Sequence, residues 1–497
     1  MNIVLIMTDT QPTDMVGCYS GNPAALTPNI DRLASQGIRF DRAYTTCPLC
    51  TPARSALFSG THAPVNGAWA NSMAPGANFP LMGTVFSELG YRCAYTGKWH
   101  LDGTSYFGDG EPGGGFAGEW WFDGKNYAER IGPEKFAAYR RSKTSAELRA
   151  AGFGAGDVWG RHVADRAVDF LSRAGGDGRP FLLVVSFDEP HGPYVAPPGE
   201  WEEFDVSRIA LRKNFQAPLE GKPALQRQAR AESGPVTAEQ HREGLRRAYA
   251  CNRYVDGEIG RVLEAVERHH AEDTLIIYTS DHGDMQHSHG LVQKGPFMYE
   301  EAVRIPLIVR PPSGRGGRVC PELVSHADVM PTLLELAGAK IPGILHGQSF
   351  APQLREPSAP GRDALMVDFT RFALNHDGWG GFYPIRCLIT RTHKLALNLF
   401  DRDELYARDD DPDELRNRID DPTHAATRDA LHDRLLAEMN RIRDPFRGAP
   451  WGNRAWRRTG GPDYFGGTRR HRPSVFPFQP ACIDADGTRC GTVDDDE

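Results

Sequence analysis

A short segment around Cys50 combines residue types that could carry out nucleophilic chemistry. It reads C-P-L-C-T-P-A-R-S-A-L-F-S-G and spans residues 47–60. Pro52 suits the first turn of a helix, where its missing N–H costs nothing, and the residues after it can continue that helix. Cys50 would then lie at a helix N-terminus, where unpaired N–H groups, the helix dipole and the charge of Arg54 favour an anion. This placement predicts a reactive thiol.

Other polar side chains follow segments with the pattern of buried strands. Residues 2–8 form an apolar run that ends in Asp9, and a strand predicted over 274–279 is followed by Asp281 and His282. Carboxylate oxygens suit Ca²⁺ or Mg²⁺, whereas a histidine nitrogen shifts the preference towards a metal such as Mn²⁺. The two strand ends therefore predict a divalent-metal site, although a lone Asp after a strand is also a common turn residue.

Two more predicted strands end in basic or titratable residues. A strand predicted over 91–96 runs into Lys98 and His100, and a strand predicted over 180–187 runs into His191. Lys98 and His100 can point towards one ligand, or they can lie on a solvated edge. His191 can donate a proton near neutral pH, as a leaving alkoxide or phenoxide requires.

The five residues from Cys50 to Arg54, C-T-P-A-R, resemble the signature of the type I sulfatases, which have an alkaline-phosphatase-like fold. In that family the Cys is oxidised to formylglycine, and the hydrated aldehyde is the nucleophile. The first-strand Asp, G-K-W-H, P-H-x-P and a D-H-G element with a following Lys match the family in order, up to about residue 445. The resemblance implies metal-dependent hydrolysis of a sulfate ester, after a formylglycine-generating enzyme has modified Cys50.

The resemblance also implies a role for each candidate residue. The implied metal ligands are Asp9, modified Cys50, Asp281 and His282. Arg54 and Lys98 are implied to hold the sulfate and the nucleophile, and His100 to assist release. His191 and Lys294 are implied to contact the sulfate or to protonate the leaving oxygen. Calcium is the expected metal, with Mn²⁺ and Mg²⁺ as alternatives.

The chain departs from the commonest sulfatase pattern at two places. It has Asp9-Thr10 where many members have two Asp, and Asp281-His282 where many have Asp-Asn. Both departures resemble the branch with phosphonate monoester hydrolases and choline-sulfatases. A phosphonate monoester or phosphodiester hydrolase with the same nucleophile is therefore one alternative, and a non-catalytic protein that binds sulfated glycans through an unmodified Cys50 is another. A phosphomutase of the same superfold would need Ser or Thr at this position. Thr10 itself is interpreted as a strand-end turn residue.

Strands that alternate with helices must position these side chains. Helices are predicted to begin at Thr27-Pro28 and to cover residues 81–89, 158–174, 326–338 and, as one long helix or a broken pair, 237–269. Residues 103–125 hold many Gly and aromatic residues and are predicted to form a substrate-facing loop. This order predicts an α/β fold with a doubly wound, mostly parallel sheet flanked by helices, and a site along its carboxyl edge. A Pro/Gly-rich stretch over 342–362 predicts a boundary between a catalytic domain, residues 1–360, and a smaller C-terminal α+β domain, residues 361–497. In the second domain a hairpin is predicted over 385–399, turning around 392–394, and a helix over 424–443, before an irregular tail.

Composition narrows the class of protein. With 497 residues, 40% hydrophobic and 25% charged, the chain is expected to be a soluble globular enzyme. Its net charge of −8 argues against nucleic acid as a partner, and neither an apolar run of about 20 residues nor a signal peptide is seen, so no membrane and a cytoplasmic location are expected. Nine scattered cysteines do not form a disulfide framework. The expected partner is a small-molecule or oligosaccharide sulfate ester, and a homo-oligomer is left open. Five aromatic side chains could stack on the substrate or pack in the core: Trp69, Trp99, Trp120, Trp121 and Trp379.

Overall fold

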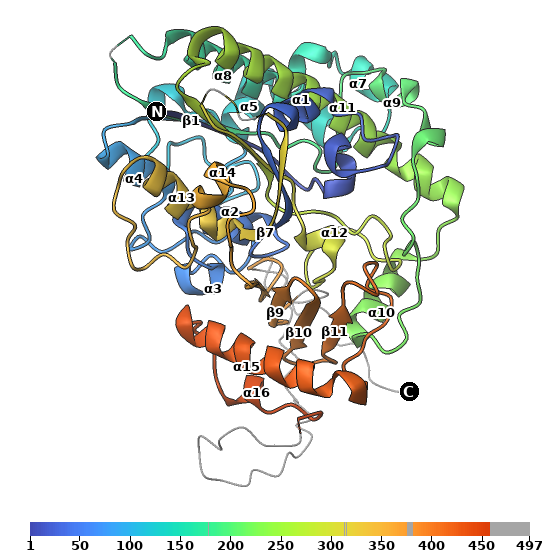
Figure 1. Ribbon diagram of the computed structural model, residues 1–497. Coiled ribbons are helices and arrows are strands. Elements are labelled where there is room, and N and C mark those ends of the chain that lie inside the picture. The colour runs from blue at the N-terminus through green and yellow to red at the C-terminus, as the bar shows by residue number, and fades with distance from the viewer. Residues whose placement is uncertain (177, 313, 315, 375–380, 458–497) are drawn as a thin grey trace, which may run out of the picture.

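The computed structural model describes residues 1–457 apart from 177, 313, 315 and 375–380. A seven-stranded sheet lies at its centre, in the order β3-β4-β1-β5-β6-β2-β7 (Figure 1). Its strands are β1 (Asn2–Thr8), β2 (Ile38–Tyr44), β3 (Arg92–Gly97), β4 (Phe181–Ser186), β5 (Thr274–Ser280), β6 (Leu307–Arg310) and β7 (Arg318–Ser325). Of these described strands, only β6 runs antiparallel to its neighbours. The predicted mostly parallel α/β sheet is therefore confirmed.

Helices cover both faces of this sheet. The main helices of the chain are α1 (Pro28–Gln36), α2 (Cys50–Ser59), α3 (Ala63–Asn66), α4 (Met82–Glu88), α5 (Gly124–Ile131), α6 (Pro133–Arg141), α7 (Ser145–Ala150), α8 (Trp159–Arg173), α9 (Glu200–Glu203), α10 (Ala224–Ser233), α11 (Ala238–His270), α12 (Glu300–Val303), α13 (Val329–Leu336), α14 (Ala351–Arg355), α15 (Ala425–Arg441) and α16 (Ala449–Gly452). The group with α1, α8 and α11 lies on one side of the sheet, and the group with α2, α4, α13 and α14 lies on the other (Figure 1).

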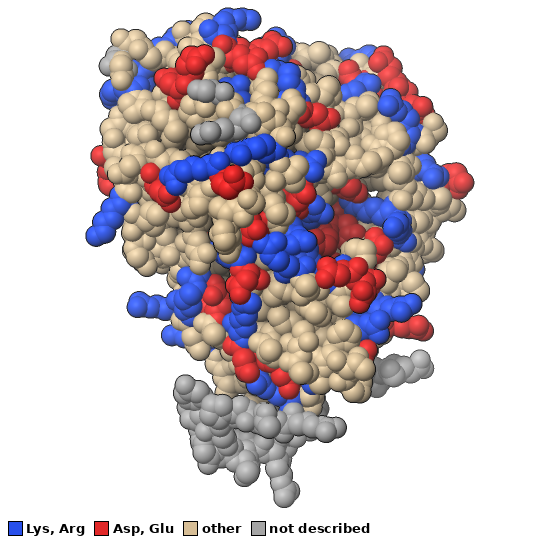
Figure 2. Space-filling view, viewed as in Figure 1, with Lys and Arg blue, Asp and Glu red and all other residues tan. Residues whose placement is uncertain are grey.

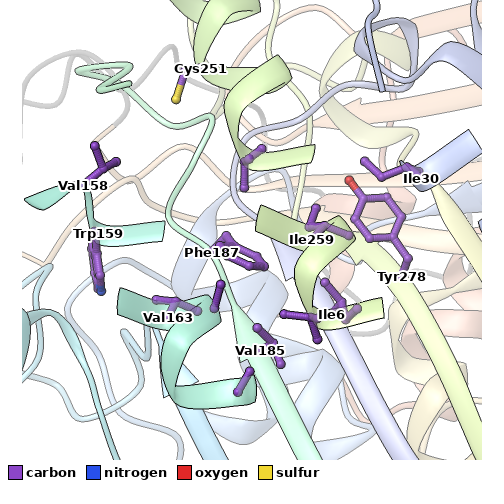
Figure 3. Packing of buried hydrophobic residues seen from close by; sticks show 14 of the residues in the cluster. Ile6, Ile30, Val158, Trp159, Val163, Val185, Phe187, Cys251, Ile259 and Tyr278 are labelled. Atoms are coloured by element: carbon purple, nitrogen blue, oxygen red, sulfur yellow. The ribbon is translucent and has the colours of Figure 1, made fainter. Parts of the chain in front are cut away.

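The strands supply apolar side chains to both helical layers, because successive residues of a strand point to opposite faces. In β1, Val4 and Ile6 pack with the α8 and α11 side, whereas Ile3, Leu5 and Met7 pack with the α2 and α13 side. Figure 3 shows the first of these layers, where Ile6 and Val185 of the sheet meet side chains of α8 and α11. Burial on both faces explains why β1 is an unbroken apolar run in the sequence.

The longest helix, α11, spans 33 residues and corresponds to the helix predicted over 237–269. It begins at a capping box, in which the Thr237 hydroxyl accepts the Gln240 N–H and the Gln240 side chain accepts the Thr237 N–H. Its Val255, Ile259 and Val262 are buried against the sheet. No helix within the described residues is both long enough and apolar enough to cross a membrane.

A second, antiparallel sheet follows in the order β11-β10-β9-β8. Its strands are β8 (Ala364–Phe369), β9 (Ile385–Thr390), β10 (His393–Asn398) and β11 (Glu404–Ala407). Helix α15 packs against it (Figure 1). The hairpin prediction is confirmed, but its turn lies at 391–392, one residue earlier than predicted, because His393 already pairs with Ala407. The division at residue 360 stays a prediction, and the tail after residue 457 lies outside the described residues.

Two local predictions were wrong in detail. The segment 103–125, predicted as a loop, contains a 3-10 turn at Gly118–Trp120 and the start of α5, whose N-terminus is capped by the Asp123 carboxylate. The helix predicted over 326–338 is split into a 3-10 turn, His326–Asp328, and α13. The split follows from a capping interaction, since the Asp328 carboxylate accepts the Ser325 N–H ahead of the α-helix.

Candidate active site

Helix α2 begins at Cys50, as the position of Pro52 predicted, and every residue of the helix is buried. Leu49 before it is extended, and Gly60 ends it in the left-handed conformation that glycine adopts at helix C-termini. Cys50 is 1% exposed. The helix therefore holds one cysteine rigidly inside the protein, with its N-terminal end directed at the carboxyl edge of the sheet.

The prediction of a reactive thiol was wrong. Burial, reinforced by the Asp9 carboxylate, raises the pKa of Cys50 and outweighs the effects of Lys294, Lys98 and Arg54. Cys47, the neighbouring thiol, is also buried, and burial together with Asp368 raises its pKa well above the usual value. An unmodified Cys50 is thus a protonated thiol, poorly suited to be a nucleophile itself.

Strand pairing brings the two predicted acidic residues together. Strands β1 and β5 are parallel neighbours, with Thr8 opposite Ser280, so Asp9 and Asp281 leave the sheet side by side. Together with Cys50 and His282 they form a buried group whose ligand atoms all lie within 4.8 Å of one another. The Sγ atom of Cys50 is 3.1 Å from Nε2 of His282 and 3.8 Å from Oδ1 of Asp9. In a modified protein this sulfur position would belong to a formylglycine oxygen.

The electrostatics of this group suit a cation. Burial and the Asp9 carboxylate raise the pKa of Asp281 to about 7, because two buried carboxylates repel each other. Burial opposes ionisation of Asp9 as well, but the positive charges of Lys98 and Arg54 hold its pKa well below the usual value. A positive ion between the carboxylates would relieve the repulsion. Two carboxylates, an imidazole and a modified Cys50 oxygen would be a donor set for a hard divalent ion.

Arg54 holds the two carboxylates in place. Its Nη2 donates to Oδ2 of Asp9 and its Nε donates to Oδ2 of Asp281, each at 3.0 Å. Nη1 donates to the Lys98 carbonyl at 2.7 Å and to the Ser186 hydroxyl at 2.9 Å. These four hydrogen bonds engage most of the five donors of the guanidinium. The main contribution of Arg54 is therefore to orient the acidic residues.

Lys98 and His100 both lie inside the protein, which excludes the solvated edge. Lys98 is fully buried, and its Nζ lies 2.8 Å from Oδ2 of Asp9 and 3.2 Å from Oδ1 of Asp188. His100 is 4% exposed, and its φ of 60° is unusual for a residue other than glycine. Burial, Lys98 and Arg54 hold the pKa of His100 well below the usual value. The site thus carries a neutral imidazole beside fixed cations.

His191 and Lys294 contact each other close to Asp9. Nζ of Lys294 lies 2.8 Å from Nε2 of His191 and 3.3 Å from the Thr10 hydroxyl. The His191 side chain is 19% exposed, and its Nε2 is 3.9 Å from Oδ1 of Asp9. Burial, Lys294 and Lys98 hold the pKa of His191 well below the usual value. The structure therefore brings all nine predicted site residues around one point, and the free site holds a neutral His191.

Comparison with known proteins fits this geometry. The model of the sulfatase family matches residues 1–339, and the model of the C-terminal region of N-sulphoglucosamine sulphohydrolase matches residues 287–441. The chain is 44% identical to the uncharacterized sulfatase YidJ of Escherichia coli strain K12, over 94% of this chain and 93% of YidJ. The chain belongs to the sulfatase family. It is a sulfuric ester hydrolase, as the C-T-P-A-R resemblance implied.

Solved structures share the fold of this sulfatase. A protein solved in complex with its substrate D-glucosamine-2-N,6-O-disulfate has a TM-score of 0.73 and 23% identity, with 90% of this chain and 99% of that chain covered. The phosphonate monoester hydrolase of Agrobacterium radiobacter has a TM-score of 0.72 and 22% identity, with 89% and 96% covered. Both similarities establish the alkaline-phosphatase-like architecture, which hosts sulfate and phosphonate chemistry alike.

Sequence reasoning missed three residues that the sulfatase places at its site. Thr10, interpreted as a turn residue, donates its N–H to Asp281 at 3.1 Å and its hydroxyl to Asp9 at 2.7 Å, with a φ of 59°. Asp188 contacts Lys98, and Tyr106 places its ring under the Lys98 ammonium, 3.7 Å from the ring centroid. Thr10 and Asp188 lie next to recognised motifs, which was an available signal. Tyr106 comes from the segment 103–125, predicted as a substrate-facing loop from its Gly and aromatic residues, but no single residue of that segment was named.

The candidate aromatic residues divide between packing and exposure. Trp99 and Trp121 are buried; Trp99 packs edge-on against Tyr95 and Trp121 stacks on it, so both belong to the core of the sulfatase. Trp120 is partly exposed and packs against Phe170 of α8. Trp379 lies outside the described residues.

On the face shown in Figure 2, basic and acidic side chains are interspersed. The basic side chains of the candidate site, Lys98, Arg54 and Lys294, are instead buried.

Proposed function

We propose that this sulfatase hydrolyses sulfate esters of carbohydrates with a formylglycine derived from Cys50 and one divalent metal ion. The observation that carries the proposal is the buried group of Asp9, Cys50, Asp281 and His282, whose ligand atoms converge within 4.8 Å. The sulfated glucosamine bound to the structural relative supports a sulfated sugar as the substrate. Calcium is the proposed ion because oxygen donors predominate once Cys50 is oxidised, with Mn²⁺ and Mg²⁺ as alternatives.

The residues of the site have different roles in hydrolysis. Lys98 and Lys294 offset the negative charge of the sulfate, and Arg54 fixes the carboxylates that would hold the metal ion. The ion, when bound, would supply further positive charge for the transferring group. The hydrate of formylglycine would supply the hydroxyl that attacks sulfur, and its second hydroxyl lets the aldehyde reform. His191, whose Nε2 contacts Lys294 at 2.8 Å, would pass a proton to the leaving oxygen.

The modification and the activity are tested together. The protein is produced together with a formylglycine-generating enzyme, and the mass of the peptide that contains residue 50 is measured by mass spectrometry. Conversion of Cys50 lowers its mass by about 18 Da, which separates formylglycine from the products of ordinary thiol oxidation. Sulfate release is then measured on a panel of sulfated sugars and aryl sulfates.

Two variants serve as a matched pair. Cys47→Ser alters a thiol that is equally buried, three residues earlier, and should keep both the mass change and the activity. Cys50→Ala should lose both. A fully active enzyme with a plain thiol at residue 50 would exclude formylglycine. Release of phosphonate or phosphate in place of sulfate would favour the phosphonate hydrolase alternative.

A further inference from the structure

Asp188 is a third buried carboxylate beside the anion site, and both of its oxygens are engaged. It is 2% exposed. Oδ1 accepts the Tyr106 hydroxyl and pairs with Nζ of Lys98 at 3.2 Å, and Oδ2 accepts the Tyr139 hydroxyl at 3.0 Å. Its carbonyl also accepts the His191 N–H at 2.9 Å. Two phenols and one ammonium therefore fix this carboxylate next to the proposed site of reaction.

The position of Asp188 changes the charge balance around the substrate. Asp188 is not one of the four proposed metal ligands, so it serves no metal directly. With it, three carboxylates (Asp9, Asp188 and Asp281) face three cations (Arg54, Lys98 and Lys294). Without it the same pocket would carry one more net positive charge.

We propose that Asp188 is a specificity-determining residue that favours singly charged sulfate monoesters over doubly charged phosphate monoesters. The proposal rests on the proposed function. The Coulomb energy between Asp188 and a bound ester is proportional to the charge of the ester, so a dianion is disfavoured twice as strongly as a monoanion. For unit charges about 10 Å apart in a protein, the extra repulsion amounts to about a tenfold change in an equilibrium constant.

A purely structural role predicts a different outcome. If Asp188 only holds Lys98 in place, any change that loosens the contact should lower the hydrolysis of both esters, and that of the doubly charged phosphate at least as much, because Lys98 is a cation. If the charge of Asp188 selects the substrate, its removal should instead raise the phosphate-to-sulfate ratio. The direction in which the ratio of the two kcat/KM values changes therefore distinguishes an electrostatic role of Asp188 from a purely structural one.

The test compares 4-nitrophenyl sulfate with 4-nitrophenyl phosphate, which share a leaving group, on the modified, metal-loaded enzyme at pH 8. Asp188→Asn should raise the phosphate-to-sulfate ratio of kcat/KM about tenfold. Asp188→Glu keeps the charge, and Tyr139→Phe removes only a hydrogen bond to Asp188, so both should leave the ratio within about twofold. The effect of Asp188→Asn should shrink at pH 5, because the second pKa of a phosphate monoester is about 6.

The outcomes are distinct. An unchanged or lowered phosphate-to-sulfate ratio in an active Asp188→Asn enzyme, or an equal change in Tyr139→Phe, would overturn the role of Asp188. Where Asp188→Asn does not fold, Asp188→Ser is measured instead, since it is also neutral and leaves space for a water between the two phenols. Failure of the wild-type enzyme to release sulfate from any sulfate ester would refute the proposed function itself, whatever the ratio.

Discussion

The contact between His191 and Lys294 determines how a proton can reach the leaving oxygen. Nδ1 of His191 lies 2.6 Å from the Gly192 carbonyl oxygen, so the N–H is assigned to Nδ1. Nε2 then accepts a hydrogen bond from Nζ of Lys294 at 2.8 Å. In the free site His191 is neutral, since burial, Lys294 and Lys98 hold its pKa well below the usual value. A bound sulfate ester brings a negative charge, which favours the protonated ring.

His191→Asn is the informative change. The asparagine oxygen can still accept a hydrogen bond from Lys294, but the side chain cannot carry a proton. A positioned general acid contributes about 10²- to 10⁴-fold, or about 3 to 5 kcal/mol of barrier, and mainly when the leaving group is poor. We expect a loss of that size in kcat on a sulfated sugar and at most about tenfold on 4-nitrophenyl sulfate, whose phenolate departs unaided. KM should change little, because the variant removes no charge from the free site.

Lys294→Met is the comparison for this experiment. It removes a cation, so it should weaken binding of both substrates and raise KM for both. Steady-state kinetics on the two substrates with both variants provides the measurement. Equal losses on the sulfated sugar and the nitrophenyl ester in His191→Asn would refute the reasoning. His191 would then only orient Lys294 or the anion.

Three further predictions concern the metal, stability and pH. Asp281→Asn should lower bound metal and activity together, activity by about 100-fold, and full metal occupancy by elemental analysis would remove Asp281 from the ligand set. Asp444→Asn breaks a fully buried pair with Arg386 and should cost about 3 kcal/mol of unfolding free energy in urea, whereas Asp420→Asn, in an exposed pair, should cost less than about 1. Burial lowers the pKa of His346 to about 3, and its Nδ1 accepts a backbone N–H. The unfolded chain therefore binds more protons below about pH 6.5, and stability should fall as pH drops towards 3, by up to about 1.4 kcal/mol per pH unit from this residue. In thermal melts, His346→Gln should reduce the loss of stability per pH unit. An unchanged pH dependence would refute the contribution of His346.

Only the tertiary structure decided the electrostatics of the site. The helix N-terminus suggested a reactive Cys50, yet burial and Asp9 raise its pKa. The sequence alone left His191 available as a proton donor near neutral pH, whereas the folded site surrounds it with two lysines. A pKa depends on solvent exclusion and on charges that are close in space, and neither follows from the neighbours along the chain.

The sequence by itself determined the fold class and the main members of the site. Unbroken apolar strands that end in Asp9 and Asp281 required a sheet buried on both faces, and parallel pairing then placed both carboxylates at one edge. Pro52 marked the start of α2 because proline fits the first helical turn. Contacts between residues far apart in the chain could not be predicted from the sequence. Tyr106 and Asp188 are 82 residues apart, and their hydrogen bond depends on how a loop packs over the sheet, which no local periodicity encodes.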